Sequence, residues 1–135
     1  MNIATHDVTN QSTALAGHNV YGGDHALRDA LAFHAPGADE TARVALGALL
    51  GSEAMQTHAR LANVHKPSLH THDRFGHRVD SVEFHPSYHA LLGAAVDAGL
   101  HATPWAQQGP GAHIERAAGF LMLPSSNRRC CAPSR

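Results

Sequence analysis

Most of this chain carries apolar residues at every third or fourth position, the spacing that places them on one face of a helix. Five segments show this spacing, and they predict a mainly α-helical domain of about five helices. The predicted helices run from Asp24 to Pro36-Gly37, from about Asp39 to Leu50, from Ser52 to Lys66-Pro67, from Pro86 to Gly99, and from about Ile114 to Leu123.

Residues at the ends of these segments support the assignment. Asp24 and Ser52 stand where an N-cap side chain accepts a free amide of the first helical turn. Pro86 suits the first position of a helix, where its missing amide proton costs nothing. Gly51 is predicted to end the second helix in the left-handed conformation, and Gly99 is predicted to end the fourth.

The apolar residues of each helix predict its buried face. They are Leu27, Ala30, Leu31 and His34; Ala42, Ala45, Leu46, Leu49 and Leu50; Met55, His58, Ala59 and Ala62; Tyr88, Leu91, Leu92, Ala95 and Val96; and Ile114, Ala117, Ala118, Leu121 and Met122. Alanine supplies 24 of the 58 apolar residues, and Leu, Ile, Val and Phe together supply 26. Because methyl-sized side chains bury little apolar area, we expect a thin core that needs a partner surface.

Three stretches lack the helical period. Residues 1–23 read as an extended polar segment that ends at Gly22-Gly23, and residues 68–85 read as a hairpin-like insert. In the insert, residues 73–76 (Asp-Arg-Phe-Gly) suit a turn, and Val82 and Phe84 alternate with polar neighbours. The stretch around Pro104-Trp105 and Pro110-Gly111 is predicted to be a loop.

The last residues differ in character from the rest. Residues 124–135 contain no acidic residue, and Pro124 is expected to block continuation of the last helix. The sequence therefore predicts a helical domain over residues 1–123 and an aberrant or disordered tail over 124–135. Two explanations stay open: an ordinary disordered tail, or a reading frame disrupted near codon 124.

Charge and cysteine content narrow the function classes. Ten basic and eleven acidic residues give a net charge of −1, which offers no electrostatic footprint for nucleic acid. Residues 1–13 lack the pattern of a secretory signal, and no apolar run approaches the ~20 residues of a membrane span. Cys130 and Cys131 are adjacent, so they are poorly placed to pair with each other. We expect a soluble, cytoplasmic protein without membrane contact.

Thirteen histidines raise the question of a metal site. The best candidate set is His70, His72, Asp73 and His77, followed by His85 and His89 at the i, i+4 spacing of helical zinc ligands. The histidines are spread along the whole chain, however, and no glutamate follows His85. Surface and capping roles are the favoured interpretation, so no metal ligand is assigned.

Other chemistry is sparse in this sequence. No Gly-rich dinucleotide turn and no phosphate-binding lysine motif is present, and Lys66 is the only lysine. Ser87 lacks the context of a nucleophile elbow. Asp80 and Glu83 are expected to be solvated, while Arg74 and Arg78 are expected to fix the turn by ion pairs with Asp80. We therefore assign no catalytic, cofactor-binding or metal-binding residue.

Several blocks, taken together, resemble the opening of the AidB-like acyl-CoA dehydrogenases. The similarity extends over about residues 3–123, in order. The blocks are residues 5–11 (Thr-His-Asp-Val-Thr-Asn-Gln), 61–64 with Pro67, 74–80 (Arg-Phe-Gly-His-Arg-Val-Asp), 80–91, 99–105 (Gly-Leu-His-Ala-Thr-Pro-Trp) and 116–122 (Arg-Ala-Ala-Gly-Phe-Leu-Met).

This resemblance implies a family of FAD-dependent oxidoreductases acting on the CH–CH bond of acyl-CoA thioesters. It implies homotetramers built from a helical domain, a β-barrel domain and a second helical domain, with flavin between the last two. The AidB-like branch is associated with the response to alkylation damage and, through a far C-terminal region, with DNA. After Leu123 this sequence departs from the family pattern, so no flavin ligand or catalytic base is carried over.

Three hypotheses follow, in decreasing order of weight. The first is a truncated N-terminal domain of such an enzyme, inactive alone and without a yellow chromophore. The second is an interaction module that docks on a full-length relative through an exposed face of Leu121, Met122 and Leu123. The third is a histidine-rich metal-binding protein.

Overall fold

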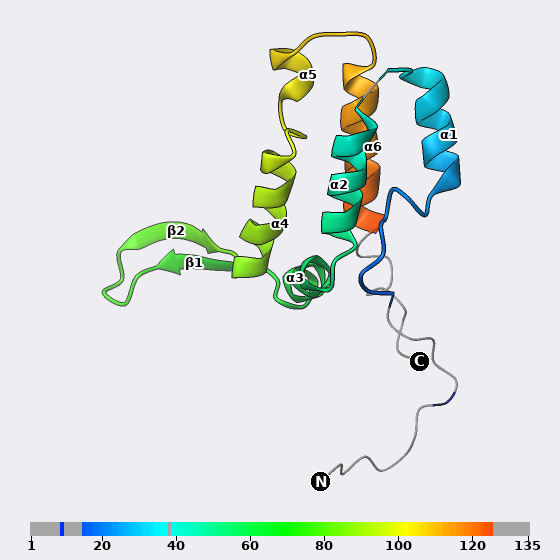
Figure 1. Ribbon diagram of the computed structural model, residues 1–135. Coiled ribbons are helices and arrows are strands. Elements are labelled where there is room, and N and C mark those ends of the chain that lie inside the picture. Colours follow the sequence, from blue (N-terminus) through cyan, green and yellow to red (C-terminus); the bar gives the residue numbers. More distant parts are fainter. Residues whose placement is uncertain (1–8, 10–14, 38, 126–135) are drawn as a thin grey trace.

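The chain folds into helices with one projecting β-hairpin (Figure 1), in a computed structural model that describes residues 9, 15–37 and 39–125 and side chains as far as residue 123. The elements, in chain order, are α1 (His25–His34), α2 (Glu40–Leu50), α3 (Glu53–Val64), β1 (Ser68–His72), β2 (Arg78–Glu83), α4 (Pro86–Asp97), α5 (Thr103–Ala106) and α6 (Ala112–Ser125). The mainly α class is confirmed, although the described residues form six helices, one more than predicted.

Helices α1, α2 and α6 stand side by side, and α3 runs across the lower end of the molecule next to α4 (Figure 1). The core lies among these helices and takes most of its large side chains from Leu and Met. Its buried members are Tyr21, Leu31, Leu50, Met55, Ala118 and Met122. No helix among the described residues is long and apolar enough to span a bilayer.

The predicted caps are confirmed. Asp24 Oδ1 accepts the amide of Leu27 at 2.9 Å, and Ser52 Oγ accepts the amide of Met55 at 3.3 Å. Pro86 lies in the first turn of α4, and Gly99 follows that helix with φ +70°. These features depend only on neighbours within a few residues, which explains why the sequence pattern reveals them.

The prediction for Gly51 is wrong in its mechanism. Its φ is −82°, a right-handed value, so a left-handed stop is not the reason for glycine here. A Cβ at this position would lie 1.6 Å from the carbonyl oxygen of His18. The glycine is therefore needed for close packing of residues 15–23 against α2, and a distant segment imposes that need.

Residues 15–23 are accordingly more than a polar lead-in. The amide of Gly17 donates to Gly51 O at 2.9 Å, and the amide of Val20 donates to Gly47 O at 3.1 Å. Tyr21 is only 2% exposed and belongs to the core. The remaining part of the predicted lead-in, apart from Thr9, lies outside the described residues, as does the resemblance block at 5–11.

Several predicted core positions face outward instead. On α4, Tyr88, Leu92 and Val96 are exposed, while Leu91 and Ala95 are half-buried and Ser87 is fully buried. The positions that also prove to be exposed on the other helices are Ala30, His34, Ala42, Ala45, Leu49, Ile114, Ala117 and Leu121. The helical period identified these helices correctly, but their apolar sides are wider than the surface available to cover them.

Two boundaries also differ from the prediction. The expected loop around Pro104-Trp105 contains the short helix α5, whose first turn holds Pro104 in the conformation that proline prefers. Helix α6 extends to Ser125, so Pro124 lies in its final turn rather than beyond it. The arginines and cysteines of the tail lie outside the described residues, and the domain boundary at 123 stays a prediction.

The hairpin predicted for residues 68–85 is confirmed. Strands β1 and β2 pair antiparallel, with Leu69 opposite Val82 and His70 opposite Ser81. The register shifts between His70 and His72, where Asp80 adopts φ +44°. Every residue of both strands is exposed, and the hairpin projects away from the helices (Figure 1).

Candidate functional site

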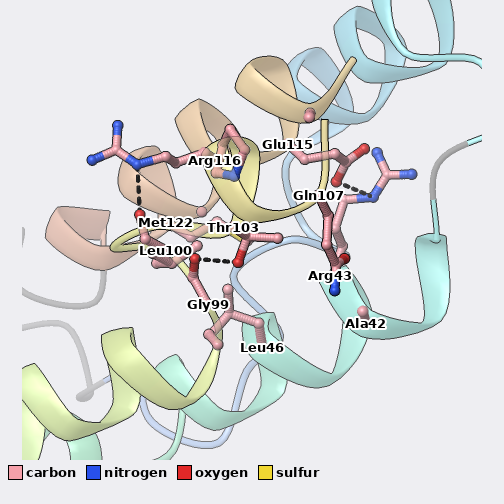
Figure 2. A pocket seen from close by; sticks show the side chains of 14 residues that line it. Ala42, Arg43, Leu46, Gly99, Leu100, Thr103, Gln107, Glu115, Arg116 and Met122 are labelled. Atoms are coloured by element: carbon pink, nitrogen blue, oxygen red, sulfur yellow. Dashed lines mark hydrogen bonds and ion pairs between the residues drawn. The ribbon is translucent and has the colours of Figure 1, made fainter. Parts of the chain in front are cut away.

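A cleft of about 330 Å³ lies between α2, α5 and α6 (Figure 2). Its wall is mostly apolar and includes Leu46, Leu100, Pro104 and Met122. Cavities of this size suit small ligands with an apolar body.

Two glycines allow this cleft to form. Gly99 ends α4 with positive φ, and the hydroxyl of Thr103 donates to its carbonyl oxygen, which fixes the turn into α5. On α6, a Cβ at Gly119 would lie 2.3 Å from Leu100 Cδ2. Glycine at 119 therefore lets α6 approach the turn closely.

The polar end of the cleft is an ion pair between α2 and α6. Arg43 Nε lies 3.6 Å from Glu115 Oε2, and Arg43 Nε also reaches the carbonyl oxygen of Asp39 at 3.4 Å. The Arg43 guanidinium lies 5.5 Å from the ring centre of Tyr21, and the residue is only 8% exposed. Glu115 Oε1 is buried without a hydrogen-bond partner among the described residues. An arginine so well enclosed serves to join helices.

The cleft does not fit FAD. Proteins hold the pyrophosphate of a dinucleotide with backbone amides at a Gly-rich turn and a helix N-terminus. Here the enclosed cation, Arg43, is paired with Glu115, and Arg116 Nε donates to the carbonyl oxygen of Leu100 (Figure 2).

The candidate metal ligands do not converge on one point, and several of them bond to other partners. His70 Nε2 pairs with Glu83 at 2.9 Å, and His77 Nδ1 pairs with Asp73 at 3.0 Å. His85 is the N-cap of α4, and its Nδ1 accepts the amide of Ser87 at 3.1 Å. Within residues 15–37 and 39–125, no three His, Cys, Asp or Glu side chains gather as a metal site requires.

Ser87 has a histidine neighbour that the sequence did not indicate. Its hydroxyl lies 3.1 Å from His58 Nδ1, across the contact between α3 and α4. In the described structure no carboxylate contacts that imidazole, and Ser87 is only 2% exposed. A buried serine without an orienting acid behind its histidine suits helix packing rather than nucleophilic catalysis.

The hairpin turn is held chiefly by Asp73, a role that the sequence analysis missed. Its Oδ1 accepts the amides of Phe75 at 2.8 Å and His77 at 2.9 Å. These bonds, led by the one from the His77 amide, hold the pKa of Asp73 below its ordinary value. The signal was present in the sequence as Asp at the first position of a turn with Gly at the fourth.

The expected ion pairs around this turn are confirmed in part. Arg78 Nε lies 2.6 Å from Asp80 Oδ2, as predicted. Arg74 instead lies over the ring of Phe75, 4.5 Å from its centre. Glu83 pairs with His70, and its side chain is still 73% exposed, as expected of a solvated carboxylate.

Comparison with known proteins supplies a family. Residues 10–134 match the sequence profile of the adaptive response protein AidB N-terminal domain. A putative acyl-CoA dehydrogenase AidB of Escherichia coli (strain K12) is 36% identical over 123 residues. That alignment covers 90% of this chain and 23% of the relative, so the chain spans about a quarter of the relative's length.

Solved structures show the same fold. One, described as the apo form of Bd2924, superposes with a TM-score of 0.75 at 23% identity, over 87% of this chain and 24% of that chain. Another is ACDH-11 of Caenorhabditis elegans in complex with C11-CoA, with a TM-score of 0.66 at 22% identity, over 91% of this chain and 22% of that chain.

Proposed function

This chain belongs to the AidB N-terminal domain family, and on that basis we propose that it is the helical N-terminal domain of an FAD-dependent, acyl-CoA dehydrogenase-type oxidoreductase. We propose further that it does no chemistry alone. Its role is to pack against the flavin-carrying domains, either in one longer polypeptide or as a separate chain.

The observation that carries this proposal is the uncovered apolar surface of α4. Residues 90–96 of this helix contain no polar side chain, and a helix that is apolar on most sides is normally buried. Yet Tyr88, Leu92 and Val96, spaced four residues apart, are 39%, 49% and 42% exposed. The stripe they form, called here the α4 stripe, is the surface we assign to contact with the flavin-carrying domains.

A groove on another side of the same helix supports this assignment. It lies between α2 and α4, and small apolar residues form most of its walls, among them Ala42, Ala45, Ala90 and Gly93. Small side chains permit close approach of another helix backbone. The α4 stripe and this groove together leave α4 ready to be enclosed by further helices.

Resemblance to the family suggests the remaining properties, which are proposals here. FAD, the acyl-CoA substrate and DNA would be bound through regions other than the described residues, in a cytoplasmic homotetramer linked to the alkylation response. The docking face first predicted at residues 121–123 needs adjustment, because Met122 is 1% exposed and belongs to the core.

The test is co-expression of this chain with the E. coli relative, both intact and lacking its own matching N-terminal segment. We expect a stable complex with the shortened relative, weakened by Leu92→Gln in the α4 stripe. Phe33→Gln on α1, where Phe33 is 80% exposed, is the matched control and should leave the complex intact.

The intact and shortened forms of the relative distinguish a domain that completes the enzyme from a free-standing interaction module. Binding to the shortened form alone supports a domain that completes the enzyme, while equal binding to the intact form favours a free-standing interaction module. Failure to bind either form, with this chain folded, would contradict both.

A further inference from the structure

Arg116, on α6, lines the cleft away from the Arg43–Glu115 ion pair and has an aromatic environment. Its guanidinium carbon lies 5.1 Å from the ring centre of Trp105, on α5, and 4.6 Å from that of Phe120. Figure 2 shows the Arg116 side chain extending away from the ion pair of Arg43 and Glu115. The two charges of neighbouring residues 115 and 116 therefore have separate environments.

The guanidinium is held in place by the backbone. Arg116 Nε donates to the carbonyl oxygen of Leu100 at 2.6 Å. This bond is possible because Gly119 lets α6 approach Leu100 so closely. An arginine fixed in this way loses little side-chain entropy on binding a ligand.

The charge of Arg116 has no acidic partner among the described residues. With Nε–H engaged by Leu100 O, the N–H groups of the two terminal nitrogens remain for another acceptor. The flanking rings are open to solvent as well, since Trp105 is 59% and Phe120 is 43% exposed. An immobilised fork of donors beside accessible aromatic surface is suited to a ligand that is part anion and part apolar.

We propose that Arg116, Trp105 and Phe120 form a binding site for a carboxylate attached to an apolar group. The carboxylate would accept two parallel N–H bonds from Arg116, and the apolar group would lie on the rings. A carboxylate suits the site better than a phosphate, because a single cation balances one negative charge. The contacts that hold this site also join two separate sequence blocks, 99–105 and 116–122.

This inference is independent of the proposed function, because it concerns α5 and α6 rather than the α4 stripe. A carboxylate of this kind can be a free organic acid or a glutamate side chain between apolar residues. Hexanoate and a short peptide with one glutamate between leucines represent the two sources.

The experiment is an NMR titration of the whole chain that follows the Arg116 Nε–H and the indole N–H of Trp105. Trp105 is the only tryptophan, so its indole signal needs no separation from others. We expect hexanoate or the glutamate peptide to shift both signals saturably. Hexanamide and the matching glutamine peptide, which lack the charge, should bind at least about tenfold more weakly.

Arg116→Gln should abolish the response to the carboxylate, and Arg60→Gln, an exposed arginine on α3, should preserve it. A preference for hexanoate assigns the site to free acids, and a preference for the peptide assigns it to a polypeptide partner. Equal shifts with hexanoate and hexanamide would overturn the proposal, as would tighter binding of inorganic phosphate. If Arg116→Gln fails to fold, the comparison of hexanoate with hexanamide on the unaltered chain still shows whether the site selects a carboxylate.

Discussion

Gly51 illustrates how one residue joins segments that are distant in sequence. A side chain here would collide with the carbonyl oxygen of His18, which lies 33 positions earlier. Gly93 is a contrasting glycine within α4, because a Cβ there would have nothing within 4 Å. Glycine is therefore required at position 51 by a close contact. At position 93 it only makes the helix less stable than alanine would.

We predict opposite outcomes for alanine at these two positions. Gly51→Ala should lower the free energy of unfolding by about 1–3 kcal/mol or more, because the backbone of residues 15–23 must move. Gly93→Ala should raise it by roughly 0.5–1 kcal/mol, because alanine favours the helix. Urea denaturation measures both, and a neutral Gly51→Ala would show that residues 15–23 do not pack on α2.

Asp73 supplies a pH-dependent contact at the tip of the hairpin. Its folded pKa lies below the ordinary 3.8, chiefly because the ionised carboxylate accepts the His77 amide. Its contribution to turn stability is therefore fully present above pH 3.8 and is lost as pH falls through the lower, folded pKa.

We expect NMR signals of residues 73–77 to titrate in acid with a midpoint below that of an unstructured peptide of the same sequence. Asp73→Asn keeps an acceptor oxygen but removes the charge, so it should remove this titration. A midpoint equal to that of the peptide would contradict the bonding described for Asp73.

At the scale of elements, α4 leaves large apolar side chains exposed despite its apolar composition. The run of apolar residues from 90 to 96 faces α3 and the core on one side only. The effect of truncating a leucine can be compared at a covered and an uncovered position, since Leu50 is fully buried and Leu92 is 49% exposed.

Matched truncations test how much of α4 is covered in the isolated chain. Leu50→Ala should cost about 2–5 kcal/mol of unfolding free energy, as large-to-small changes in cores do. Leu92→Ala should cost less than about 1 kcal/mol, because much of its side chain stays in water. An equal loss for the two variants would mean that the α4 stripe is already buried, for example by self-association.

The sequence predicted where helices and turns lie better than it predicted which side of each helix is buried, and the reason is physical. Caps such as Asp24 and Ser52, and the turn at residues 73–76, depend on nearby backbone groups, so local patterns reveal them. Which apolar side chains are buried depends on how many surfaces surround a helix. Helix α4 reads as buried on every side because residues 90–96 carry no polar side chain, yet the described residues cover only part of it.

The cleft was not predicted for a related reason. Arg43 and Glu115 are 72 positions apart, and no local spacing links them. Likewise, the contact of Arg116 with Leu100 requires the close approach at Gly119, which only the packed helices show. The candidate metal ligands at 70–89 could be identified in the sequence, but their actual hydrogen-bond partners could not.

At the scale of the whole molecule, this chain corresponds to about a quarter of the E. coli relative. Its core is small, its hairpin is entirely exposed, and several helices carry apolar residues on their outer faces. These features agree with the proposal that the domain packs against further protein surface. If the proposal is right, FAD should bind only when this chain is combined with the flavin-carrying domains.

The most direct test is the visible absorption spectrum of the purified chain after incubation with excess FAD and removal of free ligand. We predict no retained flavin band and no oxidation of acyl-CoA thioesters by the chain alone. Stoichiometric flavin that survives gel filtration, or thioester oxidation by this chain without a partner, would contradict the account.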